Sequence, residues 1–399
     1  MSGLRAQRLA ARRAARRRAL GRGAMVAAAS VVVAVGTATG MHSALGDRDG
    51  SDTVRPASAD GSTGVRTAPM VPSGPASVSV SPSVSAPASK KASAEASPSP
   101  RKASRPPAEA PSTRLYRHPS SQVLDWVQGN PRDWRADVIE SRIADRPAAV
   151  WFTDYAPASI TSRVRAVTSG GAAQGRVPVL VAYTIPDRDC GGASQGGAPD
   201  LGAYDAWIDR FAAGLGSAEV VVVLEPDSIA QSDCLSAAGR ADRFASLARA
   251  GRVLKAANPR ARVYYDAGHS GWHPAAKQAS LLKQAGAASA ASSDGIFSNV
   301  SNFHVTSAEI AYDRQVLDAL AGPSGLGAVI DTSRNGNGAP PDGEWCDPAG
   351  RKIGRAPTLN TGEPRIDAYL WVKLPGESDG CKGTPGTFSP SYAYDLASP

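Results

Sequence analysis

The chain has 399 residues and a formal net charge of +8, but its aromatic residues and its charge are unevenly distributed. All 23 aromatic residues lie from Tyr116 onward, so the first 115 residues lack the apolar surface that offsets the entropy cost of folding. Residues 1–23 carry eight Arg and no acid, whereas from residue 115 onward 27 basic residues stand against 30 acidic ones, which argues against a nucleic-acid partner.

The chain begins with this basic segment and continues with an apolar one, "AMVAAASVVVAVG" at residues 24–36. An apolar stretch of this length matches the hydrophobic part of a secretory signal and is shorter than the ~20 residues of a membrane span. We therefore expect residues 1–44 to be an export signal and the protein to be secreted. The alternative is an uncleaved tether that anchors the protein to the outer face of the cell membrane.

Residues 45–114 are dominated by Ser, Pro, Ala and Thr with scattered charge. This composition is typical of a disordered linker. We therefore predict that residues 115–399 form the folded domain. As a default, we expect the protein to be a monomer. All four cysteines lie in that region: Cys190, Cys234, Cys346 and Cys381. An even number of cysteines in an exported chain predicts two disulfides, with three pairings open.

Seven short β-rich runs occur in the folded region, beginning at residues 148, 177, 219, 261, 295, 326 and 367. Four segments between them have the apolar spacing of helices: residues 205–216, 240–258, 275–286 and 307–322. The strand runs are almost continuously apolar, as in Val220 to Leu224, which is typical of strands buried on both faces. Strands alternating with helices predict an α/β fold with a parallel, seven-stranded, TIM-like barrel.

Polar side chains gather just after the C-terminal ends of these runs, where an α/β barrel carries its functional site. A single acid there is usually a helix cap, but a carboxylate or amide follows six of the seven strands. The residues in question are Asp187, Asp189, Glu225, Asp227, Asp266, His269, Asn299, Asn302, Asp331, Arg334, Lys373, Glu377 and Asp379.

Pairs of carboxyl groups suit the hydrolysis of an acetal between two sugars. In the inverting mode one carboxyl group protonates the leaving oxygen and another activates water, with about 6.5–9.5 Å between them. A carboxyl group close to other carboxylates in a partly apolar site has a raised pKa. Asp227 directly follows the buried run "VVVVLEP" and is therefore our candidate for the acid.

Sugar rings also stack on aromatic rings. Trp151 ends the first predicted strand, Trp272 follows Asp266 and His269, and Trp345 precedes Cys346. Core packing is the ordinary role of any one Trp, but three in rim loops favour a sugar-binding cleft.

Several sequence blocks occur in the order and at about the spacing found in glycoside hydrolase family 6, the inverting cellulases. The chain resembles this family over nearly all of residues 115–399, which implies a distorted seven-stranded α/β barrel with a substrate cleft across its C-terminal end. The blocks are "YTIPDRDC" (183–190), "LEPDSIA" (224–230), "YYDAGHSGW" (264–272), "NVSNF" (299–303), "DTSRNGNG" with "EWCDP" (331–348) and "WVKLPGESDG" (371–380).

The resemblance also implies roles for individual residues. Asp227 corresponds to the general acid, Asp189 to the aspartate that raises the pKa of the acid and assists in activating water, and Asp379 to the candidate general base. The positions that match substrate-binding residues of the family are Trp151, Tyr183, Asp266, His269, Trp272, Asn302, Trp345, Lys373 and Glu377.

The resemblance further implies which cysteines are joined. Cys190 would bridge to Cys234 and hold the loop of Asp189, and Cys346 would bridge to Cys381 and hold the loop of Asp379.

Loop length bears on where the substrate is cut. Family members that work from chain ends enclose the substrate under long loops, whereas only 32 residues separate Cys346 from Asp379 here. The resemblance therefore implies endo attack on β-1,4-glucan, with soluble or amorphous glucan as the expected substrate. Two alternatives remain: an exo-acting cellobiohydrolase of the same family, and a non-catalytic glucan-binding protein of the cell surface.

Acids at strand ends also bind magnesium, so a metal-dependent barrel enzyme is a rival interpretation. Here the aspartates occur together with Trp residues and without a phosphate-binding glycine loop. We therefore expect no metal and no cofactor.

Overall fold

A computed structural model describes residues 114–398. The expected export segment and nearly all of the expected linker lie outside these residues. No helix among the described residues is long and apolar enough to cross a membrane.

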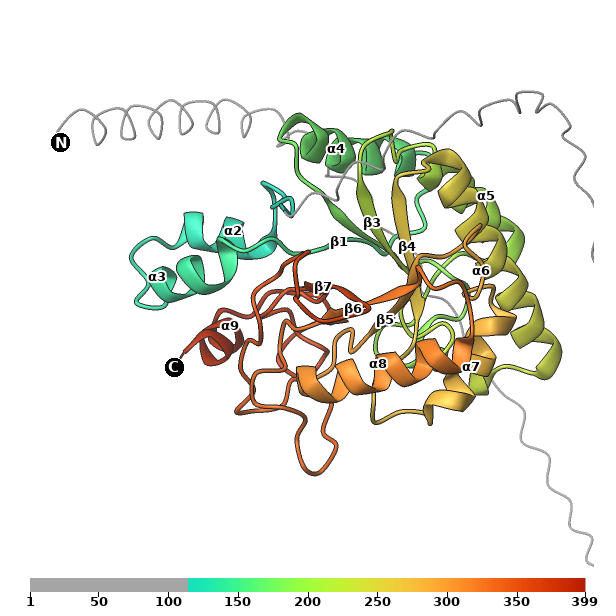
Figure 1. Ribbon diagram of the computed structural model, residues 1–399. Helices are drawn as coiled ribbons and strands as arrows, with labels where there is room; N and C mark the ends of the chain where they lie inside the picture. The colour runs from blue at the N-terminus through green and yellow to red at the C-terminus, as the bar shows by residue number, and fades with distance from the viewer. Residues whose placement is uncertain (1–113, 399) are drawn as a thin grey trace, which may run out of the picture. The chain divides into compact units, whose positions relative to one another are not determined.

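The seven predicted strands are all present and form one parallel sheet in the order β1 to β7 (Figure 1). The sequence predicts them well because their residues are apolar on both faces. Their bounds are β1 Val150–Phe152, β2 Val179–Ala182, β3 Val220–Leu224, β4 Ala261–Asp266, β5 Gly295–Ser298, β6 Gly327–Asp331 and β7 Ile366–Leu370.

The first and last strands approach each other without forming a ladder among the described residues. The contact between them is made just outside the strands, where the N–H of Ala149 donates to the carbonyl of Trp371 at 2.9 Å. The indole Nε1 of Trp151 also donates to the carbonyl of Val372 at 2.7 Å. The expected distorted barrel is confirmed, and its seam is held by a side chain as well as by the backbone.

Helices surround the outer face of the sheet (Figure 1). The four predicted helices correspond to α5 Leu201–Ala212, α6 Ala237–Ala257, α7 Ala275–Gln284 and α8 Thr306–Leu320. The sequence did not predict α2 Gln122–Gly129, α3 Ala136–Ile139 with the π-helical turn η1 Glu140–Ala144, α4 Ile160–Ala173 or α9 Pro390–Ala397. Short 3₁₀ turns follow two of the strands, η2 Asp189–Gly191 and η3 Ser232–Cys234.

Alternate residues of the buried strands face two different apolar clusters, because successive side chains of a strand point to opposite faces. In β3, Val220, Val222 and Leu224 pack outward against the helices, whereas Val221 and Val223 point into the barrel. Both faces of the strand are therefore buried, and its polar neighbours appear only where the strand ends.

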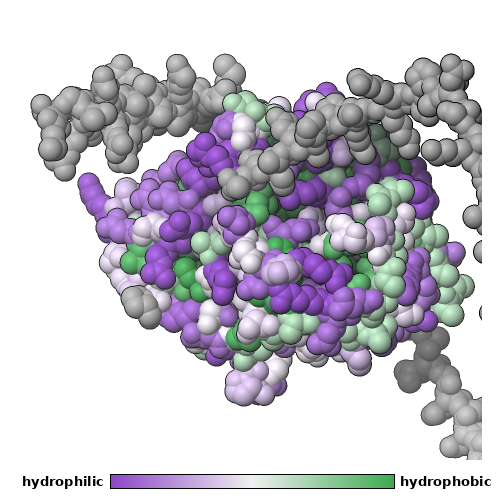
Figure 2. All heavy atoms as spheres, in the orientation of Figure 1, coloured by the Kyte–Doolittle hydropathy of each residue, from purple (hydrophilic) through white to green (hydrophobic). Residues whose placement is uncertain are grey.

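A third apolar cluster joins the two ends of the described chain. Val123 and Ile139 of the N-terminal helices pack with Ala393 and Ala397 of α9, and Trp371 completes the contact beside β7. Hydrophilic residues predominate on the face shown in Figure 2, with hydrophobic ones scattered between them.

Candidate active site

A cleft of about 1180 Å³ opens at the C-terminal ends of the strands. Most of the residues that the sequence singled out lie in its walls. They are Trp151, Tyr183, Asp189, Asp227, His269, Trp272, Asn302, Trp345, Lys373, Glu377 and Asp379.

Asp227 lies three residues past the end of β3, in a backbone conformation that non-glycine residues rarely adopt. Its φ is 69°, and that of Glu225 is 51°. Positive φ angles cost energy and concentrate at functional sites. The turn directs the partly buried Asp227 side chain into the cleft.

Desolvation raises the pKa of Asp227 to about 8, and the negative charges of Asp266 and then Asp189 add to the effect. A hydrogen bond with Tyr183 opposes it. A carboxyl group with this pKa carries a proton at neutral pH, so it can donate that proton to a leaving oxygen.

The family resemblance places Asp266 among the substrate-binding positions, but Asp266 does not line the cleft. Its side chain is buried at 1% exposure, and its carboxylate accepts the N–H groups of Ile229, Ala230 and Gly268 at 3.1, 2.8 and 2.9 Å. Its oxygens are therefore used to fold the loops beside Asp227. Asp266 affects the acid through its charge, and it does not line the cleft.

Asp189 is linked to Tyr183 through one intermediate side chain. The carboxylate Oδ2 of Asp189 accepts the N–H of Ser194 at 2.8 Å and its hydroxyl at 3.0 Å. The same Ser194 hydroxyl lies 2.9 Å from the hydroxyl of Tyr183. Gly192 permits this arrangement, because a Cβ at that position would lie 2.5 Å from the Asp189 carboxylate.

Arg188 ties the Asp189 loop to the barrel. Its guanidinium donates to the carbonyls of Ser194 at 2.8 Å and Thr153 at 2.7 Å, and it lies 4.6 Å from the centre of the Tyr183 ring. The disulfide between Cys190 and Cys234 fixes the same loop from its other side. The sequence "DRDC" thus holds one carboxylate near the acid by an arginine before it and a disulfide after it.

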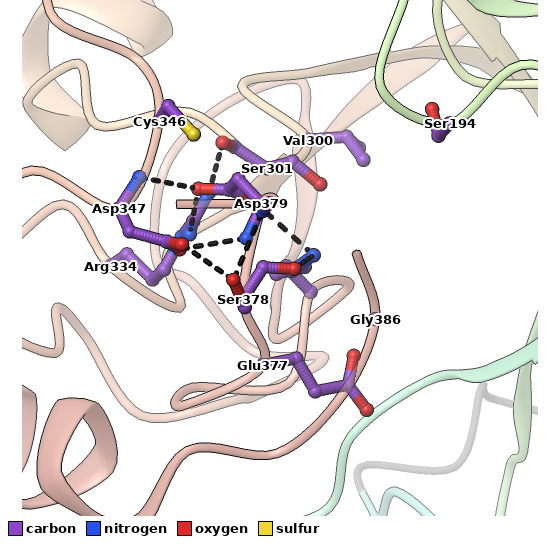
Figure 3. Close-up of polar contacts among 12 residues, drawn as sticks. Ser194, Val300, Ser301, Arg334, Cys346, Asp347, Glu377, Ser378, Asp379 and Gly386 are labelled. Atoms are coloured by element: carbon purple, nitrogen blue, oxygen red, sulfur yellow. Dashed lines mark hydrogen bonds and ion pairs between the residues drawn. The ribbon is translucent and has the colours of Figure 1, made fainter. Parts of the chain in front are cut away.

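The opposite wall of the cleft carries Asp379 (Figure 3). Its carboxylate pairs with Arg334 at 2.6 Å and with Lys373 at 3.3 Å, and its side chain is only 8% exposed. The Arg334 side chain is fully buried and also donates to the carbonyl of Ser301. Both ion pairs therefore lie in a poorly solvated place.

Asp347 is a structural residue of this wall that the sequence reasoning missed. Its carboxylate accepts the N–H groups of Asp379, Cys381 and Lys382 at 2.7, 3.0 and 2.8 Å, and the hydroxyl of Ser378 at 2.6 Å. The second disulfide, between Cys346 and Cys381, adjoins this network. Both disulfides are the pairs that the family resemblance implies. The sequence feature that could have pointed to Asp347 is its position directly after Cys346 in "EWCDP".

Glu377 points away from the network of Asp379 (Figure 3). Burial raises the pKa of Glu377 to about 7, although the charges of Lys373 and Arg334 oppose the shift. The side-chain amide of Gln122 lies 3.4 Å from its carboxylate, so α2 contributes to this end of the cleft.

Aromatic side chains line the remaining walls. Trp151 meets the Tyr183 ring edge-on, with 5.3 Å between ring centres, and Trp272 lies 5.3 Å from His269. Burial lowers the pKa of His269 to about 3, so the imidazole is neutral. Trp345 is 57% exposed, which leaves a ring face open to a ligand.

Asn302 also lines the cleft, and its side-chain amide donates to the carbonyl of Val300 at 3.0 Å. Within residues 114–398, no group of three or more His, Cys, Asp or Glu side chains has an arrangement that could hold a metal ion.

Known proteins share this sequence and fold. The family described as Glycosyl hydrolases family 6 matches residues 112–395. Endoglucanase 1 of Streptomyces sp. (strain KSM-9) is 51% identical over 288 residues, which cover 72% of this chain and 79% of that enzyme. Endoglucanase A of Thermobispora bispora is 50% identical over 296 residues, which cover 74% of this chain and 64% of that enzyme.

A solved structure is also similar. The endoglucanase Cel6 from Mycobacterium tuberculosis, in complex with methyl-cellobiosyl-4-deoxy-4-thio-β-D-cellobioside, matches with a TM-score of 0.66 and 38% identity, covering 71% of this chain and 96% of that one. Because the family match spans most of the chain, the chain belongs to glycosyl hydrolases family 6.

Proposed function

We propose that this chain is an endo-β-1,4-glucanase that hydrolyses internal glucosidic bonds of cellulose or a related β-glucan with inversion, and that Asp227 is its general acid. The observation that carries the proposal is the raised pKa of Asp227, about 8, in a wall of the cleft. The endoglucanase relatives and the thio-cellobioside bound to the similar structure support a β-glucan substrate.

In the reaction, the glycosidic oxygen takes the proton of Asp227 as its bond to the anomeric carbon breaks. A water molecule attacks that carbon from the opposite face of the ring, as inversion requires. The released sugar leaves with the proton of Asp227, and the water must lose one proton to a base.

Asp189 is better placed electrostatically than Asp379 to receive that proton. When Asp227 gives up its proton it becomes a carboxylate beside Asp189 and Asp266, and their repulsion favours protonation of one of them. Asp266 is fully occupied by backbone N–H groups. Proton arrival at Asp189, directly or through water, keeps the total charge of the group constant.

Asp379 would then act as a fixed charge. Its carboxylate pairs with Lys373, which lines the cleft, and with Arg334, which is fully buried. Since this one carboxylate faces two cations, we expect Asp379 to hold Lys373 in place at the cleft wall and not to stabilise positive charge on the sugar itself.

Endo attack needs a cleft that accepts the middle of a long chain. The exposed ring of Trp345 lies in the segment between β6 and β7 where a covering loop would have to pass, and only 32 residues separate Cys346 from Asp379. The test compares the viscosity of a soluble cellulose derivative with the reducing ends released. An early fall in viscosity at few reducing ends supports endo attack, and cellobiose release without loss of viscosity contradicts it.

Two disulfides support an extracellular setting for the domain, since such bonds persist in oxidising environments. We propose that residues 115–399 are the catalytic domain, that residues 1–44 export it or tether it to the membrane, and that residues 45–114 act as the linker. N-terminal sequencing of the protein from culture medium tests this. A mature chain that begins near residue 45 supports secretion, and an intact chain in the membrane fraction supports the tether.

A further inference from the structure

A strip of aromatic side chains runs over the surface beside one end of the cleft. It contains Phe388, Trp126, Arg135, Trp134 and Tyr394, which we call the aromatic strip. Trp134 is 72% exposed, the highest exposure of any large hydrophobic side chain among the described residues. It is more exposed than Trp345, which lines the cleft.

The rings follow one another in short steps. Phe388 and Trp126 have ring centres 6.1 Å apart, and the guanidinium of Arg135 lies 5.4 Å from the Trp126 ring and 5.8 Å from the Trp134 ring. Tyr394 meets Trp134 edge-on, with 4.5 Å between ring centres. These steps are on the scale of single sugar rings.

The strip is held in place before any ligand arrives. Arg135 is fixed by Asp133, which accepts its Nε at 2.9 Å and its Nη2 at 2.8 Å. Trp126, Phe388 and Tyr394 pack against the apolar cluster that joins α2 to α9. Figure 1 shows α2, α3 and α9 close together on one side of the barrel. A preordered surface loses little entropy on binding.

The strip continues directly from the cleft. Gln122 lines the cleft and lies one helical turn before Trp126 on α2, so the two side chains share a face of the helix. The amide of Gln122 donates to the carbonyl of Gly386 at 2.7 Å, and its oxygen accepts the N–H of Phe388 at 3.0 Å. Gly386 also lines the cleft. The aromatic strip therefore adjoins this end of the cleft through Phe388 and Trp126.

We propose that the aromatic strip is an accessory binding surface for β-1,4-glucan, which stacks glucose units of a long chain outside the catalytic cleft. This rests on the proposed function, because the same polymer must occupy both places. Sugar rings present flat C–H faces that suit exposed aromatic rings, and the guanidinium of Arg135 already has its charge balanced by Asp133. A neutral polysaccharide fits this surface better than a charged partner.

The experiment uses the full chain and three forms of residue 134. Affinity for soluble hydroxyethyl cellulose is measured by retardation in native gels, with Asp227→Asn as the background so that the polymer is not cut. Trp134→Ala removes the ring, and Trp134→Phe keeps an aromatic face. With Asp227 intact, kcat/KM is measured on cellotetraose, a short oligosaccharide that we expect to occupy the cleft alone.

We expect Trp134→Ala to weaken binding of the polymer by about two- to tenfold, and Trp134→Phe to retain most of the affinity. Cleavage of cellotetraose should be unchanged in both. Equal polymer affinity in the wild type and Trp134→Ala would overturn the proposal, as would an equal loss on the polymer and on cellotetraose. If the wild type cleaves no cellotetraose, the proposed function fails instead.

A competing occupant of the strip is a second copy of the chain. Light scattering across a concentration series decides this point. A monomer in both the wild type and Trp134→Ala is expected. A wild-type dimer that Trp134→Ala converts to a monomer would identify the strip as a self-association surface and overturn the glucan assignment.

Discussion

On the wall formed after β2 and β3, Asp227 lies near Asp189 and near the buried Asp266 at the end of β4, and the pKa of Asp227 is raised to about 8. On the wall formed after β6 and β7, the Asp379 side chain is only 8% exposed but pairs with Arg334 and Lys373. Burial alone does not decide the state of a carboxyl group. Desolvation, reinforced by neighbouring negative charges, raises the pKa of Asp227, whereas on the second wall two cations hold the carboxylate of Asp379 in place.

The largest expected effect comes from removing the donor. Asp227→Ala should lower kcat on cellopentaose by about 10²- to 10⁴-fold, since the glycosidic oxygen then leaves without a proton. The loss should be much smaller on an aryl cellobioside whose phenol leaves easily as an anion. Comparing kcat on the two substrates measures this, and equal losses on both would show that Asp227 is not the acid.

Breaking the ion pair of the second wall should mainly affect stability. Arg334→Leu leaves the buried Asp379 with Lys373 alone, and we expect the free energy of unfolding to fall by ~3–5 kcal/mol. Urea denaturation followed by fluorescence measures it. The matched control is Arg314→Ala, which breaks a half-exposed pair with Glu363 and should cost at most ~1 kcal/mol. Similar costs at both sites would contradict the fixed-anion account.

The two disulfides should differ in their effect on catalysis. Asp189 and Cys190 have φ angles of 56° and 47°, a strained arrangement that the bond to Cys234 helps to maintain. Replacing Cys190 and Cys234 by Ser should let the loop relax and lower kcat by about tenfold.

Replacing Cys346 and Cys381 by Ser should lower kcat by less than about threefold, because Asp347 still holds the Asp379 loop through four hydrogen bonds. Both pairs are measured on cellopentaose well below the unfolding temperature. A larger loss from the second pair would contradict the comparison.

The smallest effect is a shift in pH dependence. Activity should fall as pH rises through about 8, where Asp227 loses its proton. Asp189→Asn removes a negative charge that raises this pKa, so the alkaline limb of kcat/KM for the residual activity should move to lower pH. Asp154→Asn is the control, because it removes a largely exposed carboxylate of the same cleft and should leave the limb in place. An alkaline limb that stays in place in Asp189→Asn would show that the charge of Asp189 does not raise the pKa of Asp227.

The sequence predicts the sheet better than the ends of the chain. Most strand residues are apolar, as in Val220–Leu224, and this composition indicates burial on both faces. The missed helix α4 contains Thr, Ser and two Gly, which are weak helix formers, so its helicity depends on packing against the sheet. The missed α2 and α9 are stabilised by each other, across almost the whole length of the folded region.

The sequence predicts which residues line the cleft but not which of their side chains pair with each other. Acids after the strands had to meet at one rim because parallel strands end on the same side. The pairing of Arg334 with Asp379 and the role of Asp347 depend on how the loop between β6 and β7 folds back, which no local pattern encodes. For the same reason the sequence predicts Asp266 as a substrate-binding residue, whereas in the structure its carboxylate accepts backbone N–H groups.

The most direct test of the central claim is proton NMR of the products during the first minutes of hydrolysis of cellopentaose, with the wild type and Asp227→Ala side by side. Protonation by Asp227 with attack of water from the opposite face predicts that the wild type first releases the α-anomer, while the variant releases almost nothing. Initial release of the β-anomer would mean retention of configuration and would contradict the mechanism. Undiminished cleavage by Asp227→Ala would contradict the assignment of the acid.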